Sequence, residues 1–239
     1  MIRDAAVAEI KQAFGFRKSL DAVCVTALIN SQQEMEKLPV LPWFLETEDE
    51  VSSTTAPVVD ASGSLTYEDR VPLPADFLRE KEDCYLKILH PNSKYYVDLV
   101  KKDADYITKG VFERQHYNYL DYPNSTFDVF RPIKHGIPAM YAISSNYFRV
   151  RPYPDDVYNL QFRYYKKDGL LTDNVENLWL YHFPYLLIGR SIVRVASATR
   201  DQEAVALGNQ MQQDALQSMI QETESRESTN RRYAMGQDV

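Results

Sequence analysis

Glycine and cysteine are both scarce in this chain of 239 residues, which contains 8 glycines and 2 cysteines. No two glycines form a GxG triplet, and none precedes a Lys-Ser or Lys-Thr pair. A dinucleotide fingerprint and a P-loop both need such glycines, because the backbone approaches phosphate closely there. The sequence contains neither motif. Cys24 and Cys84 provide no framework for a disulfide-rich secreted fold.

Long apolar runs and an excess of basic residues are also missing. No run approaches the roughly 20 apolar residues that cross a bilayer, and residues 1–15 carry no signal-peptide core. The formal net charge is −7. This argues against a protein that wraps nucleic acid with its whole surface, since phosphate binding requires a basic face. We therefore expect no membrane association, and assembly in the cytoplasm.

Few residue patterns indicate catalysis. The histidines are widely separated, without an HExxH or CxxC motif, so we expect no metal site and no cofactor. The carboxylate pairs Asp155-Asp156 and Asp103-Asp105 lie in turn-like sequence, where such side chains commonly support turns. No serine lies in a GxSxG motif. We predict that the protein is not an enzyme, and a hydrolase that uses carboxylates brought together by the fold stays open as an alternative. The four histidines are His90, His116, His135 and His182.

The most apolar segment is residues 184–199, PYLLIGRSIVRVASAT, which has helical periodicity. Its apolar positions form two adjacent lines that cover about half the circumference, so the helix needs neighbours on more than one side. The opposite face carries Arg190, Arg194 and Ser197. Arg190 and Arg194 are candidates either for solvated charge or for ion pairs with carboxylates of an adjacent subunit. The two lines are Tyr185, Ile188, Ile192 and Val195, and Leu186, Gly189, Val193 and Ala196.

The rest of the chain predicts an α+β fold. Helical spacing recurs near both ends, and Gly208 in the last helix would allow a close antiparallel approach to Gly189. The predicted apolar strip of this last helix is Ala204, Leu207, Gly208, Met211, Ala215 and Met219. Residues 46–70 are acidic and rich in Ser and Thr, which indicates a loop. Residues 103–122 mix charge and tyrosine without a decisive period, and we predict a short helix and irregular chain there. We predict a helical bundle from residues 1–45 and 176–228, an inserted antiparallel β-rich portion over 46–175, and an extended polar tail over 229–239.

The clearest strand pattern spans residues 140–164, where a three-strand antiparallel meander is expected. Arg149, Arg151 and Arg163 would lie on its outer face, interleaved with tyrosines. This face could bind single-stranded nucleic acid by charge and stacking, or it could be a solvated or protein-binding surface. The sequence has 17 tyrosines, a residue type favoured at interfaces. The interleaved tyrosines are Tyr147, Tyr153 and Tyr165.

The order of these features resembles the head-to-tail adaptor (connector) proteins of tailed bacteriophages, especially short-tailed ones. The resemblance rests on the amphipathic N-terminal helices, the entry LPADF, the runs YAISSNYFRVRPYPDDVYNLQFRYYKKDG and WLYHFPYLLIGRSIVRVASATRDQEA, and the polar end. It covers most of the chain. Residues 103–138 have no match, and the acidic segment 46–70 has no evident counterpart.

The resemblance implies a structural virion protein in the neck of the particle, with no cofactor. Such adaptors form a homo-oligomeric ring, usually of twelve copies, that docks under the portal protein. The ring extends the DNA channel, through which DNA passes without specific binding, and gives the tail, its nozzle and its fibre proteins an attachment platform. The C-terminal tail grips the portal. In this chain the grip would belong to Arg231, Arg232 and Tyr233.

Overall fold

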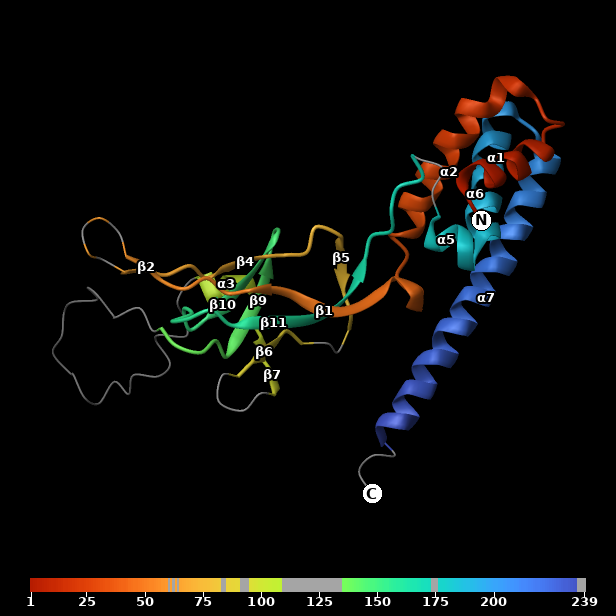
Figure 1. Ribbon diagram of the computed structural model, residues 1–239. Helices are drawn as coiled ribbons and strands as arrows, with labels where there is room; N and C mark the ends of the chain where they lie inside the picture. The colour runs from red at the N-terminus through yellow and green to blue at the C-terminus, as the bar shows by residue number, and fades with distance from the viewer. Residues whose placement is uncertain are drawn as a thin grey trace. The chain divides into compact units, whose positions relative to one another are not determined.

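The computed structural model describes residues 1–59, 61, 63, 65–82, 85–90, 95–108, 135–172 and 176–235. The chain divides into two compact units, one made of Met1–Glu46 and Tyr165–Val239 and the other of Thr47–Tyr164. The first unit is helical and the second is built from strands, which confirms an α+β fold (Figure 1). In the part of the chain described, no helix has the length and apolarity needed to cross a membrane.

The described part of the helical unit contains three long helices and two short ones, and the β unit is inserted in the chain between α2 and α5. Gly15 and Phe16 both have positive φ after the first helix, which places the chain reversal where glycine is expected. The helices are α1 (Arg3–Gln12), α2 (Asp21–Met35), α5 (Leu178–His182), α6 (Pro184–Thr199) and α7 (Gln202–Met235), with 3-10 turns η1 (Lys18–Leu20) and η2 (Trp43–Leu45).

Helix α6 is the centre of this unit. Its bounds match the prediction, with Pro184 in the first turn and Arg200 in the left-handed conformation at the C-cap. It packs against α1 and α2 on one side and α7 on the other, so burial extends further around it than the sequence predicted (Figure 1). Tyr185, predicted in an apolar line, is half exposed, so this position of the line is not part of the core. The buried residues are Leu186, Leu187, Ile188, Gly189, Ser191, Ile192, Val195 and Ala196.

Gly189 and Gly208 bring α6 and α7 together, as predicted. A Cβ atom on Gly189 would lie 2.8 Å from the backbone of both Gly208 and Gln212. A Cβ atom on Gly208 would lie 2.7 Å from the carbonyl oxygen of Gly189. The side chain of Asp201 accepts a hydrogen bond from the Ala204 N–H at 3.1 Å, which caps α7. Backbone therefore packs on backbone at this crossing.

The C-terminal tail differs from the prediction. Residues 229–235, predicted to be extended, continue α7 to Met235, and residues 236–239 lie outside the described part. No proline or glycine occurs between Gly208 and Gly236, so nothing in the sequence breaks the helix. An i,i+4 ion pair between Glu222 and Arg226, at 2.9 Å, adds support. In Figure 1 the blue end of α7 extends past the other helices of its unit.

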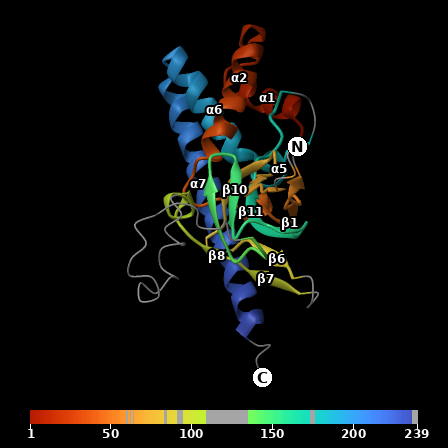
Figure 2. The ribbon, with the colours of Figure 1, turned by 90° about the vertical axis from the view of Figure 1, so that its left-hand side faces the viewer.

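The β unit contains two main sheets and a small ribbon. The five-stranded sheet has the order β1-β11-β6-β7, with β5 also paired to β11; β6 and β7 run together at its edge (Figure 2). The four-stranded sheet has the order β4-β10-β9-β8, and β2 pairs with β3. The strands are β1 (Glu46–Ser53), β2 (Val58–Val59), β3 (Leu65–Thr66), β4 (Arg70–Pro72), β5 (Phe77–Glu80), β6 (Lys87–Leu89), β7 (Tyr96–Asp98), β8 (Val100–Lys101), β9 (Met140–Ser144), β10 (Tyr147–Arg151) and β11 (Asn159–Lys166).

The predicted three-strand meander is wrong. β9 and β10 form an antiparallel hairpin, but β11 belongs to the other sheet. Both β10 and β11 alternate apolar and polar residues, and the apolar side chains of both enter one shared core. Residues 152–158, which include two prolines, carry the chain from one sheet to the other in place of a tight hairpin turn. The core includes Tyr141, Phe148, Val150, Leu160, Phe162 and Tyr164.

The acidic segment 46–70 is also more regular than predicted. Residues 46–53 form β1, which pairs with β11, and residues 58–59 and 65–66 form the β2-β3 ribbon. A polar strand is stable here because it joins an existing sheet, which a sequence window does not reveal. Of residues 103–138, the structure gives the short helix α3 (Ala104–Thr108) and an isolated bridge at His135.

Candidate assembly surface

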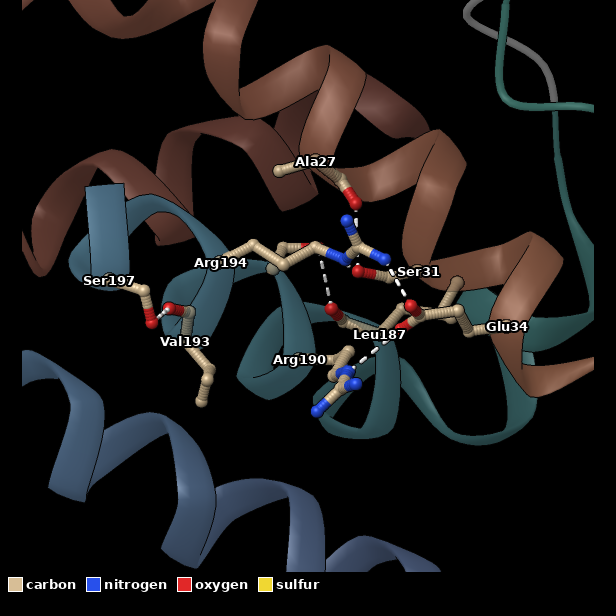
Figure 3. A network of polar contacts seen from close by, with 9 residues as sticks. Ala27, Ser31, Glu34, Leu187, Arg190, Val193, Arg194 and Ser197 are labelled. Atoms are coloured by element: carbon tan, nitrogen blue, oxygen red, sulfur yellow. Dashed lines mark hydrogen bonds and ion pairs between the residues drawn. The ribbon is translucent and has the colours of Figure 1, made fainter.

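A polar network joins α2 to the centre of α6. Arg190 donates from Nε to Glu34 Oε2 at 2.8 Å, and Arg194 donates from a terminal nitrogen to Glu34 Oε1. The three side chains are about one third exposed. Figure 3 shows both arginines reaching from α6 toward Glu34 on α2. The two arginines therefore share one carboxylate of their own chain, a pairing that the sequence analysis did not anticipate.

Two buried serines, Ser31 on α2 and Ser191 on α6, belong to the same interface, and Figure 3 labels Ser31. Ser191 Oγ lies 3.1 Å from Ser31 Oγ and donates to the carbonyl oxygen of Leu187 at 2.7 Å. Ser31 Oγ donates to the carbonyl oxygen of Ala27, also at 2.7 Å. Both residues are fully buried. The small hydroxyls satisfy their own hydrogen bonds while letting α2 and α6 approach.

The network carries a surplus of positive charge. The hydrogen bond from Arg190 holds the pKa of the Glu34 carboxyl below its usual range, and the charge of Arg194 adds to this effect. Glu34 thus stays ionised, and two guanidinium groups face one carboxylate. Within the described residues, the buried Nε of Arg194 has no hydrogen-bond partner. Because the two arginines are about one third exposed and share one carboxylate, the surface keeps one uncompensated positive charge that can attract a carboxylate from outside.

A groove lies beside this network, between the first half of α2 and the second half of α6. It is an open depression of about 350 Å³. Val23 at its edge is 44% exposed, so its side chain adds apolar surface to the groove. The lining residues are Ala22, Val23, Thr26, Ala27, Asn30, Arg194 and Val195.

An aromatic cluster holds the middle of α7 against the rest of its unit. The Arg226 guanidinium stacks on the Trp43 ring, 3.6 Å from its centroid. The His182 ring stacks on Phe44 with centroids 4.7 Å apart and meets Trp43 edge-on at 4.9 Å. Burial lowers the pKa of His182, although nearby Glu222 opposes the shift. His182 therefore has a structural role, as a ring that packs between aromatic side chains.

The predicted portal-binding residues Arg231, Arg232 and Tyr233 fall in the last turns of α7. Their backbone is helical, and their side chains lie outside the described part of the chain. Their role stays a prediction.

The predicted Arg/Tyr sheet face is not a single surface. Arg149 and Arg151 lie on β10, whereas Arg163 lies on β11 in the other sheet. Arg151 pairs with Asp69 at 3.0 Å and stacks on Tyr153 at 3.7 Å. The positive charge of Arg151 is therefore already balanced by a carboxylate of the same chain. The predicted face required β10 and β11 to be neighbours in one sheet, and the structure places them in different sheets.

The Asp155-Asp156 pair has the turn role expected for it, whereas Asp103 and Asp105 lie at the start of helix α3 and not in a turn. Asp155 accepts a hydrogen bond from the Tyr158 hydroxyl at 2.6 Å, and Asp156 accepts one from the Val157 N–H at 2.7 Å. Burial and Asp155 together raise the pKa of Tyr158. Among the described residues, no group of three His, Cys, Asp or Glu side chains could hold a metal ion. His116 lies outside the described part.

Sequence reasoning identified Arg190 and Arg194 but missed Glu34, Trp43 and Arg226. Glu34 was visible as a polar position on a helix that faces α6, but its register against α6 depends on how the helices cross. The Trp43–Arg226 contact joins residues far apart in sequence, and no local pattern marks it.

A family model described as SU10 adaptor protein matches residues 7–235 of the chain. The match covers almost all of both units. No curated protein matches the chain.

Proposed function

The chain belongs to the SU10 adaptor protein family, a family of structural phage adaptors, and from this we propose that it forms the head-to-tail adaptor ring of a bacteriophage virion. In this proposal several copies, usually twelve, dock under the portal protein in the neck. The ring extends the DNA channel and presents a platform to tail, nozzle and fibre components. The family match over residues 7–235 is the observation that carries the proposal.

The helical unit has the surfaces that a ring subunit requires. A ring needs two different faces on each subunit, because each copy contacts the next through a heterologous interface. The α2–α6 groove with its surplus of positive charge is one exposed surface, and the outward side of α7 is another. Both support assembly, and Arg190 and Arg194 remain candidates for contacts between subunits.

The length of α7 supports the proposed grip on the portal. The helix is anchored by Met219 and Thr223, which are buried, and by the stacking of Arg226 on Trp43. Beyond this anchor the backbone stays helical to Met235, past the other helices of the unit (Figure 1). In this proposal the helix carries Arg231, Arg232 and Tyr233 to the portal, while the anchored part of α7 stays in the bundle.

The two alternatives have less support. A carboxylate hydrolase needs convergent acids, but Asp155 and Asp156 form hydrogen bonds within a turn. A nucleic-acid module on a shared Arg/Tyr face lacks that face, since β10 and β11 lie in different sheets.

Electron microscopy of the purified protein, alone and mixed with the portal of the same phage, tests the proposal. We expect a ring bound to the portal in the mixture. A protein that remains separate from the portal would contradict the proposed function.

Deletion of residues 229–239 tests the grip. The truncated chain should keep its thermal stability, because the anchor at Met219, Thr223 and Arg226 is intact, but it should no longer join the portal. A second variant replaces Arg231, Arg232 and Tyr233 by alanine in the full-length chain. It should lose portal binding to the same extent as the deletion. Unchanged portal binding by both variants would refute the grip.

A further inference from the structure

We propose that the α2–α6 groove beside Arg194 receives the outward strip of α7 from a second copy of this chain. The proposal rests on the proposed ring function and assigns the two surfaces that join neighbouring subunits. The strip consists of Glu203, Leu207, Gln210 and Asp214.

The groove has an apolar wall and a cationic end. Ala22, Val23 and Ala27 supply apolar surface from α2, and Arg194 borders the groove from α6. Arg190 and Arg194 share the single carboxylate of Glu34 and are about one third exposed, so one positive charge stays uncompensated at the surface. The groove thus favours an occupant that combines an apolar side chain with carboxylates.

The strip on α7 has that composition. Its four residues lie at positions i, i+4, i+7 and i+11, so they form one line along the helix. All four are exposed, and Leu207 is 47% exposed. In the described part of the chain, neither Glu203 nor Asp214 forms an ion pair. The strip therefore presents one leucine between two uncompensated carboxylates.

Sequence analysis placed Leu207 in the buried face of α7, together with Gly208. The structure turns Leu207 outward, because Gly208 faces α6 and residue 207 lies about 100° away from it around the helix. The exposed leucine gives this polar face one apolar side chain that can enter the groove.

The positions of the two surfaces suit a repeating contact. Helix α6 lies between α2 and α7 (Figure 3), so the groove, formed by α2 and α6, and the strip, carried by α7, belong to different helices of one unit. When one copy places its strip in the groove of the next, its own groove remains open for a further copy. This is a heterologous contact, which closes into a ring at the appropriate rotation.

Cysteine cross-linking between different copies tests the contact. Val23→Cys and Leu207→Cys are prepared as two separate full-length proteins, each with Cys84→Ser; the native Cys24 is buried and does not react. The two are mixed, assembled on the portal and treated with a short bismaleimide. Both substitutions are at exposed positions, and equal melting temperatures confirm that the variants fold.

The matched control replaces Leu207→Cys by Asn209→Cys. Asn209 is also exposed, but it lies about 200° from Leu207 around α7 and outside the strip. We expect a cross-linked dimer from Val23→Cys mixed with Leu207→Cys, at least about tenfold more than from the Asn209→Cys mixture or from either protein alone.

Two failures are distinguishable. Equal cross-linking in both mixtures, or none, within complexes that contain several copies on the portal would overturn this inference and leave the adaptor function standing. Failure of the unmodified protein to join the portal would overturn the proposed function and this inference with it.

Discussion

The helical unit and the β unit achieve close packing by opposite means. In the helical unit, α6 and α7 approach because Gly189 and Gly208 have no side chains. In the β unit, the two sheets are held apart and filled by large rings, with Phe162 meeting Phe148 edge-on at 5.0 Å. We conclude that the helical unit is most sensitive to added atoms or charge, and the β unit to atoms removed.

The two tryptophans make this comparison measurable. The sequence contains only Trp43 and Trp179, and both lie in the helical unit. Trp179 is fully buried. Tryptophan fluorescence therefore reports unfolding of the helical unit, whereas amide hydrogen exchange on peptides from β9, β10 and β11 reports on the β unit.

The largest effect is expected for Ile192→Asp. Ile192 is 2% exposed at the centre of α6, so the substitution buries a carboxylate without a partner. The free energy of unfolding of the helical unit should fall by more than about 5 kcal/mol, enough to unfold a unit of ordinary stability. Tryptophan fluorescence in urea measures this. Ser197→Asp on the exposed side of α6 is the control and should change stability little. Normal stability of Ile192→Asp would show that the core lies elsewhere.

In the β unit, Phe162→Ala should cost about 4 kcal/mol. The ring is 1% exposed and lies near the rings of Phe148, Tyr141 and Tyr164, so its removal leaves a cavity. Hydrogen exchange should speed up across β9, β10 and β11, with the tryptophan signal unchanged. Tyr147→Ala, which removes a half-exposed ring from β10, is the control. Loss of the tryptophan transition in Phe162→Ala would show that the two units unfold together.

Gly189→Ala should destabilise the helical unit by about 1–2 kcal/mol. The new Cβ would lie 2.8 Å from backbone atoms of α7, and the resulting overpacking exceeds the gain of about 1 kcal/mol from replacing a helical glycine. Gly169→Ala is the control, because nothing lies within 4 Å of its Cβ position. Urea unfolding followed by fluorescence compares the two. If Gly189→Ala were more stable than the unmodified protein, α6 and α7 could move apart without losing packing energy.

These packing differences also explain which parts of the fold could be predicted from sequence. Apolar periodicity gave α6 its bounds, since a helix with two apolar lines has no other stable arrangement. Gly208 was identified as a close contact because glycine inside a helix is otherwise unfavourable. The same reasoning placed Leu207 on the buried face, because periodicity assigns an apolar stripe without showing its edges.

The β unit was harder to predict because strand pairing is not local. The alternation over β10 and β11 predicted two strands correctly, but the sheet to which each belongs depends on partners elsewhere in the chain. β1 has a polar sequence and is a strand only because β11 offers it an edge. Of the candidate site, Arg190 and Arg194 followed from the helical pattern, while their shared partner Glu34 depends on the crossing of α2 and α6.

The smallest effect is expected for Glu34→Gln, which removes the carboxylate shared by Arg190 and Arg194. The pair is about one third exposed, so at neutral pH the loss should not exceed about 1 kcal/mol. The folded pKa of Glu34 is lowered from its ordinary value of 4.5, so the ionised carboxylate stabilises the fold. That contribution is complete above the ordinary pKa and is lost as the pH falls through the folded pKa. Unfolding in urea at pH 7 and at about pH 3 should therefore show a difference between Glu34→Gln and the unmodified protein that shrinks in acid.

Glu224→Gln, at an exposed carboxylate of α7, is the control and should show no such trend. A difference that persists in acid would assign the role of Glu34 to packing and not to charge.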